Sequence, residues 1–142
     1  MAGGVNDELQ TLIESGRLAH LVTLNADGSP QVSAVWVGLD GDEIVSGHMD
    51  DRVKLRNVRR DPRVVISLEA PVEPGTFLAE YAVVYGTGRV TEGGASDLLH
   101  RLGKVYVGPD FEFPVAAAAD AGFVLRVSVD RVTGHGPWVI GP

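Results

Sequence analysis

Basic side chains gather in one short stretch of an otherwise acidic chain. The 142 residues carry 19 Asp and Glu against 12 Lys and Arg, which gives a formal net charge of −7. Half of the bases fall within residues 52–63, and these are Arg52, Lys54, Arg56, Arg59, Arg60 and Arg63. An acidic surface repels nucleic acid and anionic lipid, so a local cationic patch on it suits a small anion better than a polymer. We therefore expect a small-molecule ligand and neither a nucleic acid nor a membrane as partner.

The charges around this stretch indicate a helix over residues 52–60. Acidic residues precede it, bases end it, and a proline follows shortly after, all of which are helix boundary signals. At the start of such a helix the backbone N–H groups are unpaired, and Arg52 and Lys54 add cationic donors suited to a phosphate. Two alternatives to a phosphate site stay open. The basic residues could form a solvated helix face, an interpretation that the helix dipole favours for the bases at the C-terminus. Asp51 could also cap the helix and compete with an anion for the same N–H groups.

The sequence contains no recognisable motif for nucleophilic hydrolysis or for metal binding. There is no cysteine, the four histidines share no metal-ligand spacing, and no Gly-x-Ser-x-Gly elbow occurs. Gly86-Thr87-Gly88 begins like a dinucleotide fingerprint, but Thr91 stands where the last glycine belongs. If the chain is an enzyme, a bound cofactor must supply the chemistry.

The elements that must position the basic stretch are mostly strands. Runs of apolar and β-branched residues between turn signals predict strands over 17–24, 30–39, 43–47, 64–68, 81–91 and 123–132. Helical spacing predicts helices over 5–15, 52–60 and 95–105, the first capped by Asn6 or Asp7. We expect the first three strands to form an antiparallel meander. About six strands, three short helices and no βαβ rhythm indicate an antiparallel barrel in one domain, residues 1–142.

The predicted strand 30–39 carries polar groups on one face. Alternation places Gln31, Ser33 and Val35 on the same side, where the two polar residues could bond the polar edge of a heterocycle. The alternative is a barrel rim that faces water. Trp138 follows the last strand, and we expect it to pack on its own domain or on a partner subunit.

Taken together, these residues resemble the pyridoxamine 5′-phosphate oxidase-like split-barrel superfamily, and within it the branch that uses the deazaflavin F420. Three stretches carry the resemblance: LVTL and DGSPQVS within 21–33, RVKLRNVRRDPRV over 52–64, and GTGRV over 86–90. The resemblance covers roughly residues 8–135, and its central stretch is the most specific part.

The resemblance implies a mainly β fold with short helices, an antiparallel split β-barrel, that works as a homodimer with two cofactor sites at the interface. Arg52 and Lys54 would hold the cofactor phosphate, while two strands would line its ring system. The residues expected to bind the cofactor are Gln31, Ser33, Val35, Ser46, Gly47, His48, Arg52, Val53, Lys54, Asn57 and Trp138. The Arg-x-Lys-x-x-Asn spacing resembles the F420 branch more than the FMN oxidases, and ten Arg against two Lys suggest a GC-rich genome, compatible with F420 producers.

Three functional hypotheses follow from this resemblance. The first is an F420-dependent oxidoreductase that transfers a hydride between the deazaflavin and a small electron-poor substrate. The second is an FMN-dependent oxidase or reductase, and the third is a carrier that binds F420 or a flavin without catalysis. The chain has neither a run long enough for a membrane helix nor the N-terminal pattern of a signal peptide, so we expect a cytoplasmic protein.

Overall fold

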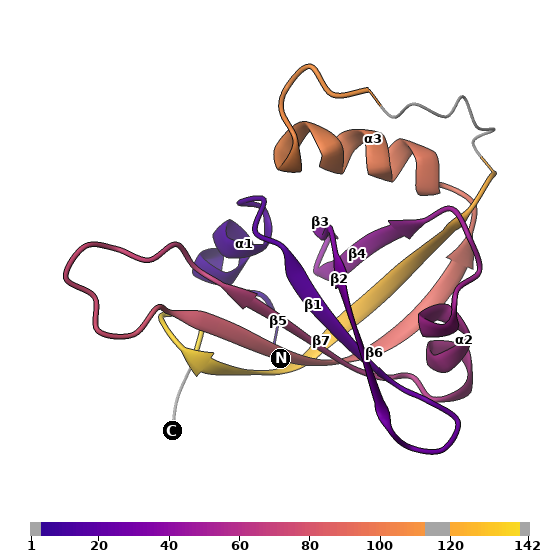
Figure 1. Ribbon diagram of the computed structural model, residues 1–142, viewed down its shortest axis with the longest axis horizontal. Coiled ribbons are helices and arrows are strands. Elements are labelled where there is room, and N and C mark those ends of the chain that lie inside the picture. The colour runs from indigo at the N-terminus through magenta and orange to yellow at the C-terminus, as the bar shows by residue number, and fades with distance from the viewer. Residues whose placement is uncertain (1–3, 113–119, 140–142) are drawn as a thin grey trace.

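The computed structural model describes residues 4–112 and 120–139 and contains one antiparallel sheet with three helices around it (Figure 1). The strands are β1 (Ala19–Leu24), β2 (Pro30–Val35), β3 (Gly38–Asp40), β4 (Glu43–His48), β5 (Arg63–Glu69), β6 (Tyr81–Glu92) and β7 (Phe123–His135). The helices are α1 (Asp7–Ile13), α2 (Val53–Arg60) and α3 (Ala95–Tyr106). The predicted mainly β, antiparallel architecture with three short helices is confirmed, with seven strands in the described residues where about six were expected.

The sheet runs in the order β2-β1-β5-β6-β7-β4-β3, which corrects the predicted meander. The chain leaves the sheet after Val35 and re-enters it at Gly38, so the predicted strand 30–39 is two strands. β2 pairs with β1 at one edge, whereas β3 pairs with β4 at the other edge. Two consecutive strands reach opposite edges of one sheet only if the sheet curls, as Figure 1 shows. The result is a split barrel.

A contact from the distant helix α3 accounts for the break between β2 and β3. The hydroxyl of Tyr106 accepts a hydrogen bond from the backbone N–H of Val37 at 3.0 Å and donates one to the carbonyl oxygen of Arg17 at 2.8 Å. The ring of Tyr106 also stacks on Trp36, with 5.3 Å between ring centroids. These contacts satisfy a backbone group that a continuous strand would have paired within the sheet. Strand alternation in the sequence carries no sign of them.

One apolar core fills the curled sheet, and it includes Leu9 of α1 and Trp138, which follows β7. Leu9 and Ile13 of α1 are fully buried in it, and α1 is capped by Asn6, whose side chain accepts from the backbone N–H of Leu9 at 2.8 Å. Trp138 belongs to the same core and is 5% exposed. A second, smaller cluster joins α3 to the outer face of β4 and β7. None of the helices in 4–112 or 120–139 has the length and apolarity that a membrane span requires.

The glycines inside β6 coincide with a register shift and with close approaches of neighbouring groups. The register between β6 and β7 shifts between Tyr85 and Gly86, and a β-carbon on Gly86 would lie 2.6 Å from the carbonyl oxygen of Ser128. A β-carbon on Gly88 would lie 3.0 Å from a methyl of Val58 in α2. Gly88 therefore lets α2 pack directly against the sheet, and this packing fixes where the basic stretch lies.

Candidate anion-binding site

Helix α2 is tied to the β1–β2 hairpin through Asn57. This residue is 2% exposed, and its Nδ2 donates to Thr23 Oγ1 and to Asn25 Oδ1, both at 3.0 Å. Its Oδ1 accepts from Arg60 at 3.1 Å, and Arg60 also donates to the carbonyl oxygen of Leu24. Asn57 was expected to bind a cofactor, but its side-chain groups are bonded within the protein. Its role here is to position α2.

The N-terminus of α2 is exposed. Among the described residues, no side chain caps this helix, and its N-cap residue is Arg52. The alternative in which Asp51 caps the helix is wrong, because its carboxylate pairs with Arg59 at 2.8 Å. Arg52 itself is 68% exposed in its side chain and pairs with Asp50 at 3.3 Å. The unpaired N–H groups and the helix dipole thus remain available to an anion.

Two residues at the end of β4, Ser46 and His48, lie beside this helix start. They are two apart in a strand and so share a face, and Ser46 Oγ lies 2.8 Å from Nε2 of His48. Burial, and then the charge of Lys54, lowers the pKa of His48 to about 4, so its imidazole is neutral at pH 7. Burial, and then the charge of Arg52, lowers the pKa of Lys54. Negative charge at this place would reverse both shifts, because it favours the protonated forms.

The polar face of β2 is half-buried rather than a rim open to water. Cross-strand partners place Gln31 opposite Thr23 and Ser33 opposite Leu21, on the side that faces the core. Ser33 Oγ is buried and has no hydrogen-bond partner among the described residues. A buried hydroxyl without a partner costs free energy, so it marks a place where a ligand's polar atom fits. Val35, by contrast, is 7% exposed and belongs to the core.

Thr23 links the two polar surfaces and was missed in the sequence. It is 1% exposed, accepts from Asn57 as described, and donates to Gln31 Oε1 at 3.4 Å. The polar face of β2 is therefore connected to α2 through one buried hydroxyl. Its only sequence signal is a threonine on the same strand face as Leu21, a pattern too common to single out.

Two other predicted residues, Val53 and Gly47, have different surroundings. Val53, in the first turn of α2, is 41% exposed and lies at the helix start as expected. Gly47 faces α3, where a β-carbon would lie 3.1 Å from Leu99 and 3.2 Å from the carbonyl oxygen of Ala95. The glycine is therefore required by helix packing.

Trp138 and His48, two of the predicted site residues, lie near opposite ends of β7 within one copy of the chain. Its Nε1 donates to the carbonyl oxygen of Tyr81 at 2.8 Å. Tyr81 pairs with His135 at the C-terminal end of β7, whereas His48 pairs with Phe123 at the N-terminal end of that strand. Trp138 thus packs on its own domain, the first of the two expected alternatives.

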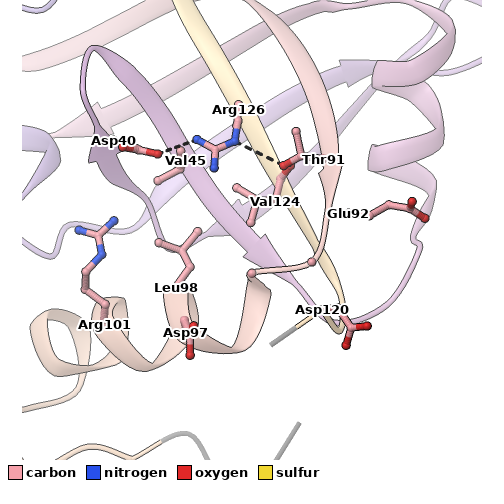
Figure 2. A pocket seen from close by; sticks show the side chains of 12 residues that line it. Asp40, Val45, Thr91, Glu92, Asp97, Leu98, Arg101, Asp120, Val124 and Arg126 are labelled. Atoms are coloured by element: carbon pink, nitrogen blue, oxygen red, sulfur yellow. Dashed lines mark hydrogen bonds and ion pairs between the residues drawn. The ribbon is translucent and has the colours of Figure 1, made fainter. Parts of the chain in front are cut away.

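A groove of about 780 Å³ lies on the opposite face of β4, next to α3 (Figure 2). Its apolar part is formed by Val45, Leu98 and Val124. Arg126 projects into it but is already paired, because it donates to Asp40 at 2.8 Å, and this contact lowers the pKa of Asp40. Since side chains alternate along β4, this groove and the Ser46–His48 pair lie on different faces of that strand. No pattern in the sequence indicated this groove.

Comparison with known proteins finds one matching family and several similar solved structures. The family model described as pyridoxamine 5′-phosphate oxidase matches residues 5–136. A solved structure named F420 reductase is 30% identical, with 87% of this chain and 94% of that chain covered and a TM-score of 0.72. A heme-binding protein from Mycobacterium smegmatis is 26% identical at a TM-score of 0.62, with 94% of this chain and 53% of that chain covered. A conserved hypothetical protein from Mycobacterium tuberculosis, 24% identical with a TM-score of 0.69 and covering 95% and 88%, shares the fold.

Proposed function

Since the chain belongs to the pyridoxamine 5′-phosphate oxidase family, we propose that it is a cytoplasmic F420-dependent oxidoreductase acting on a small electron-poor substrate. Family membership by itself supports a flavin- or deazaflavin-related oxidoreductase, and the choice of F420 is the finer proposal. The observation that carries the cofactor site is the cluster of Arg52, Lys54 and His48 at the uncapped start of α2, which suits the phosphate of F420 and of FMN alike. Similarity to the solved F420 reductase favours the deazaflavin over FMN.

The residues present fit such a cofactor at two separate points. Lys54 is half-buried, and burial, then the charge of Arg52, lowers its pKa, so a phosphate there would offset its desolvation. Arg52 and the first N–H groups of α2 would add further donors to the phosphate. On β2, the partnerless hydroxyl of Ser33 and the amide of Gln31 would bond polar atoms of the ring system.

The protein's part in the reaction is to bind, orient and shield. When bound, F420 supplies the carbon that accepts or donates the hydride. Arg52 and Lys54 anchor one end of the cofactor, and the half-buried face of β2 fixes the other, so that the ring has one orientation. The apolar core beneath β2 excludes water from that side. No side chain is assigned as proton donor.

Binding of three ligands tests this proposal against its alternatives. Purified protein is titrated with F420, FMN and hemin, the last because one relative is named as a heme-binding protein. Ligand retained after ultrafiltration is read by absorbance, with Lys54→Ala as the matched variant. We expect F420 to bind most tightly and to depend on Lys54. Tighter binding of FMN would favour the FMN-dependent enzyme, tighter binding of hemin would overturn the proposal, and F420 binding without any hydride transfer would favour a carrier.

We also propose that the active form is a homodimer, which the outer face of the sheet supports. Val32 is 60% exposed, and cross-strand partners continue it into a row through Val22, Val65 and Tyr85. A hollow of about 380 Å³ lies along this row, with Arg63 and Asp130 both lining it. A two-fold related second copy would cover the apolar row.

The dimer proposal is tested by light scattering at micromolar concentration. We expect the mass of two chains for the wild type and of one chain for Val32→Glu, which places a charge on the apolar row. Lys104→Glu, a charge change on α3, is the matched control and should stay dimeric. A wild-type mass of one chain with F420 bound would overturn the proposal.

A further inference from the structure

We propose that the groove beside α3 is a second small-molecule site, which binds organic cations that carry an apolar body, such as arylalkyl amines. Its volume of about 780 Å³ lies within the range of about 300–1,000 Å³ that is typical of small-molecule sites. The groove lies on the opposite face of β4 from Ser46 and His48, so this inference does not depend on the cofactor site.

The floor of the groove is apolar and held in place by packing. Val45, Leu98 and Val124 form it, and each is at most 9% exposed because it also belongs to the cluster that joins α3 to the sheet. Beside the floor, the chain turns from β6 into α3 through Gly93 and Gly94, which have φ angles of 82° and 81° and no side chains to fill the space. The groove therefore offers a preformed apolar surface to the body of a ligand.

The charges at one end of the groove are balanced within the protein (Figure 2). Arg126 donates to Asp40 at 2.8 Å and to Thr91 Oγ1 at 3.4 Å. The carboxylate of Glu43 lies 3.7 Å from the same guanidinium. Arg126 and, more weakly, Arg101 lower the pKa of Asp40. The two cations at this end therefore already have carboxylates beside them, and the groove has little attraction left for an anion.

The other end of the groove carries three carboxylates. Glu92 ends β6, Asp97 lies in the first turn of α3 and Asp120 precedes β7, and all three residues are exposed. Within residues 4–112 and 120–139, none of these carboxylates makes a hydrogen bond or an ion pair. Asp97 also offsets the positive end of the α3 dipole, which would otherwise favour an anion.

The arrangement of charge and apolar surface selects the occupant. The lining holds four carboxylates against two guanidinium groups, and the three carboxylates without partners lie together at one end. In Figure 2, the apolar floor separates this end from the pair formed by Arg126 and Asp40. An ammonium group is therefore complementary to the acidic end, while an aryl or alkyl body attached to it covers the floor.

Two probes of the same shape and opposite charge test this inference. Phenethylamine and 3-phenylpropionate share an arylethyl body, and at pH 7 the first is a cation and the second an anion. Binding is followed by NMR through the methyl signals of Val45, Leu98 and Val124, which line the groove. We expect phenethylamine to bind with a dissociation constant on the order of 1 mM, and 3-phenylpropionate to bind several-fold more weakly.

A double variant tests the acidic end of the groove. Asp97→Asn with Asp120→Asn should weaken phenethylamine binding about two- to fivefold, because exposed ion pairs are individually weak. Asp7→Asn with Glu8→Gln is the matched control, since it removes the same charge from two exposed carboxylates in the first turn of α1. This control and Lys54→Ala should bind phenethylamine like the wild type, because neither changes the groove.

Several results would overturn the inference. These are equal affinity for 3-phenylpropionate and phenethylamine, wild-type affinity in the double variant, or phenethylamine shifting signals elsewhere and not the groove methyls. Loss of phenethylamine binding in Lys54→Ala would place the amine at the cofactor site instead. Groove signals that move with protein concentration alone would assign the groove to a second copy of the chain and not to a small molecule. None of these results changes the binding of F420, so the proposed function stands or fails separately.

Discussion

Replacing Lys54 by alanine should weaken cofactor binding without weakening the fold. A charge-assisted hydrogen bond to phosphate contributes about 1.5–3 kcal/mol, so Lys54→Ala should cost roughly one to two decades in affinity for F420. Arg52→Ala should cost less, about two- to fivefold, because its side chain is 68% exposed and already pairs with Asp50. The double variant should approach the sum of the two effects.

The stability of the unliganded protein gives a second test of the role of Lys54. Lys54 is a half-buried cation, and burial already lowers its pKa, so removing it relieves a desolvation penalty. We expect Lys54→Ala to melt at or slightly above the wild-type temperature without ligand, and to lose the upward shift that F420 produces. Lys104→Ala removes the same charge from an exposed lysine of α3, and should leave binding unchanged. Wild-type F420 affinity in Lys54→Ala, or a large fall in its melting temperature, would refute the reasoning.

Three further changes probe the fold and its titration. Tyr106→Phe removes hydrogen bonds to two backbone groups and should lower the free energy of unfolding by about 1–2 kcal/mol in urea titrations. Gly86→Ala should cost about 1–3 kcal/mol, because a β-carbon there would lie 2.6 Å from a carbonyl oxygen of β7, whereas Gly108→Ala, with nothing within 4 Å, should be neutral. The pKa of His48 is about 4 when folded and 6.5 in an unperturbed side chain, so the unfolded chain binds more protons and stability should fall as pH drops from 6.5 to 4. The part of the fall due to His48 should be on the order of 2–3 kcal/mol and should be absent in His48→Gln.

Local signals in the sequence were enough to predict α2 and its charges. Its expected bounds, 52–60, differ from the observed helix by one residue, because the acidic residues before it and the Asp-Pro after it act within one turn. The break between β2 and β3 could not be predicted, since the Tyr106 hydroxyl that satisfies Val37 comes from 69 residues away. The mainly β barrel was predictable from alternation and turns, whereas the pairing of β3 at the far edge of the sheet was not.

The candidate site was predictable in its cations and not in its details. Residue types and spacing identified Arg52 and Lys54, but they could not tell a ligand-facing Asn57 from one that bonds Thr23 and Asn25. Both arrangements need a polar residue on a helix that meets a hairpin. Only the positions of the acceptors, set by tertiary packing, decide between them.

A division between satisfied and unsatisfied polar groups separates structural residues from candidate functional ones. Asn57 and Arg59 have protein partners that explain why they are there. The Ser33 hydroxyl has none in the described residues, and Lys54 is desolvated beside another cation. Groups like these lower the stability of the unliganded protein, so a fold selected for stability alone would not retain them. An anionic ligand with a polar ring offsets both costs at once, which is why these groups, rather than the count of basic residues, support a cofactor site.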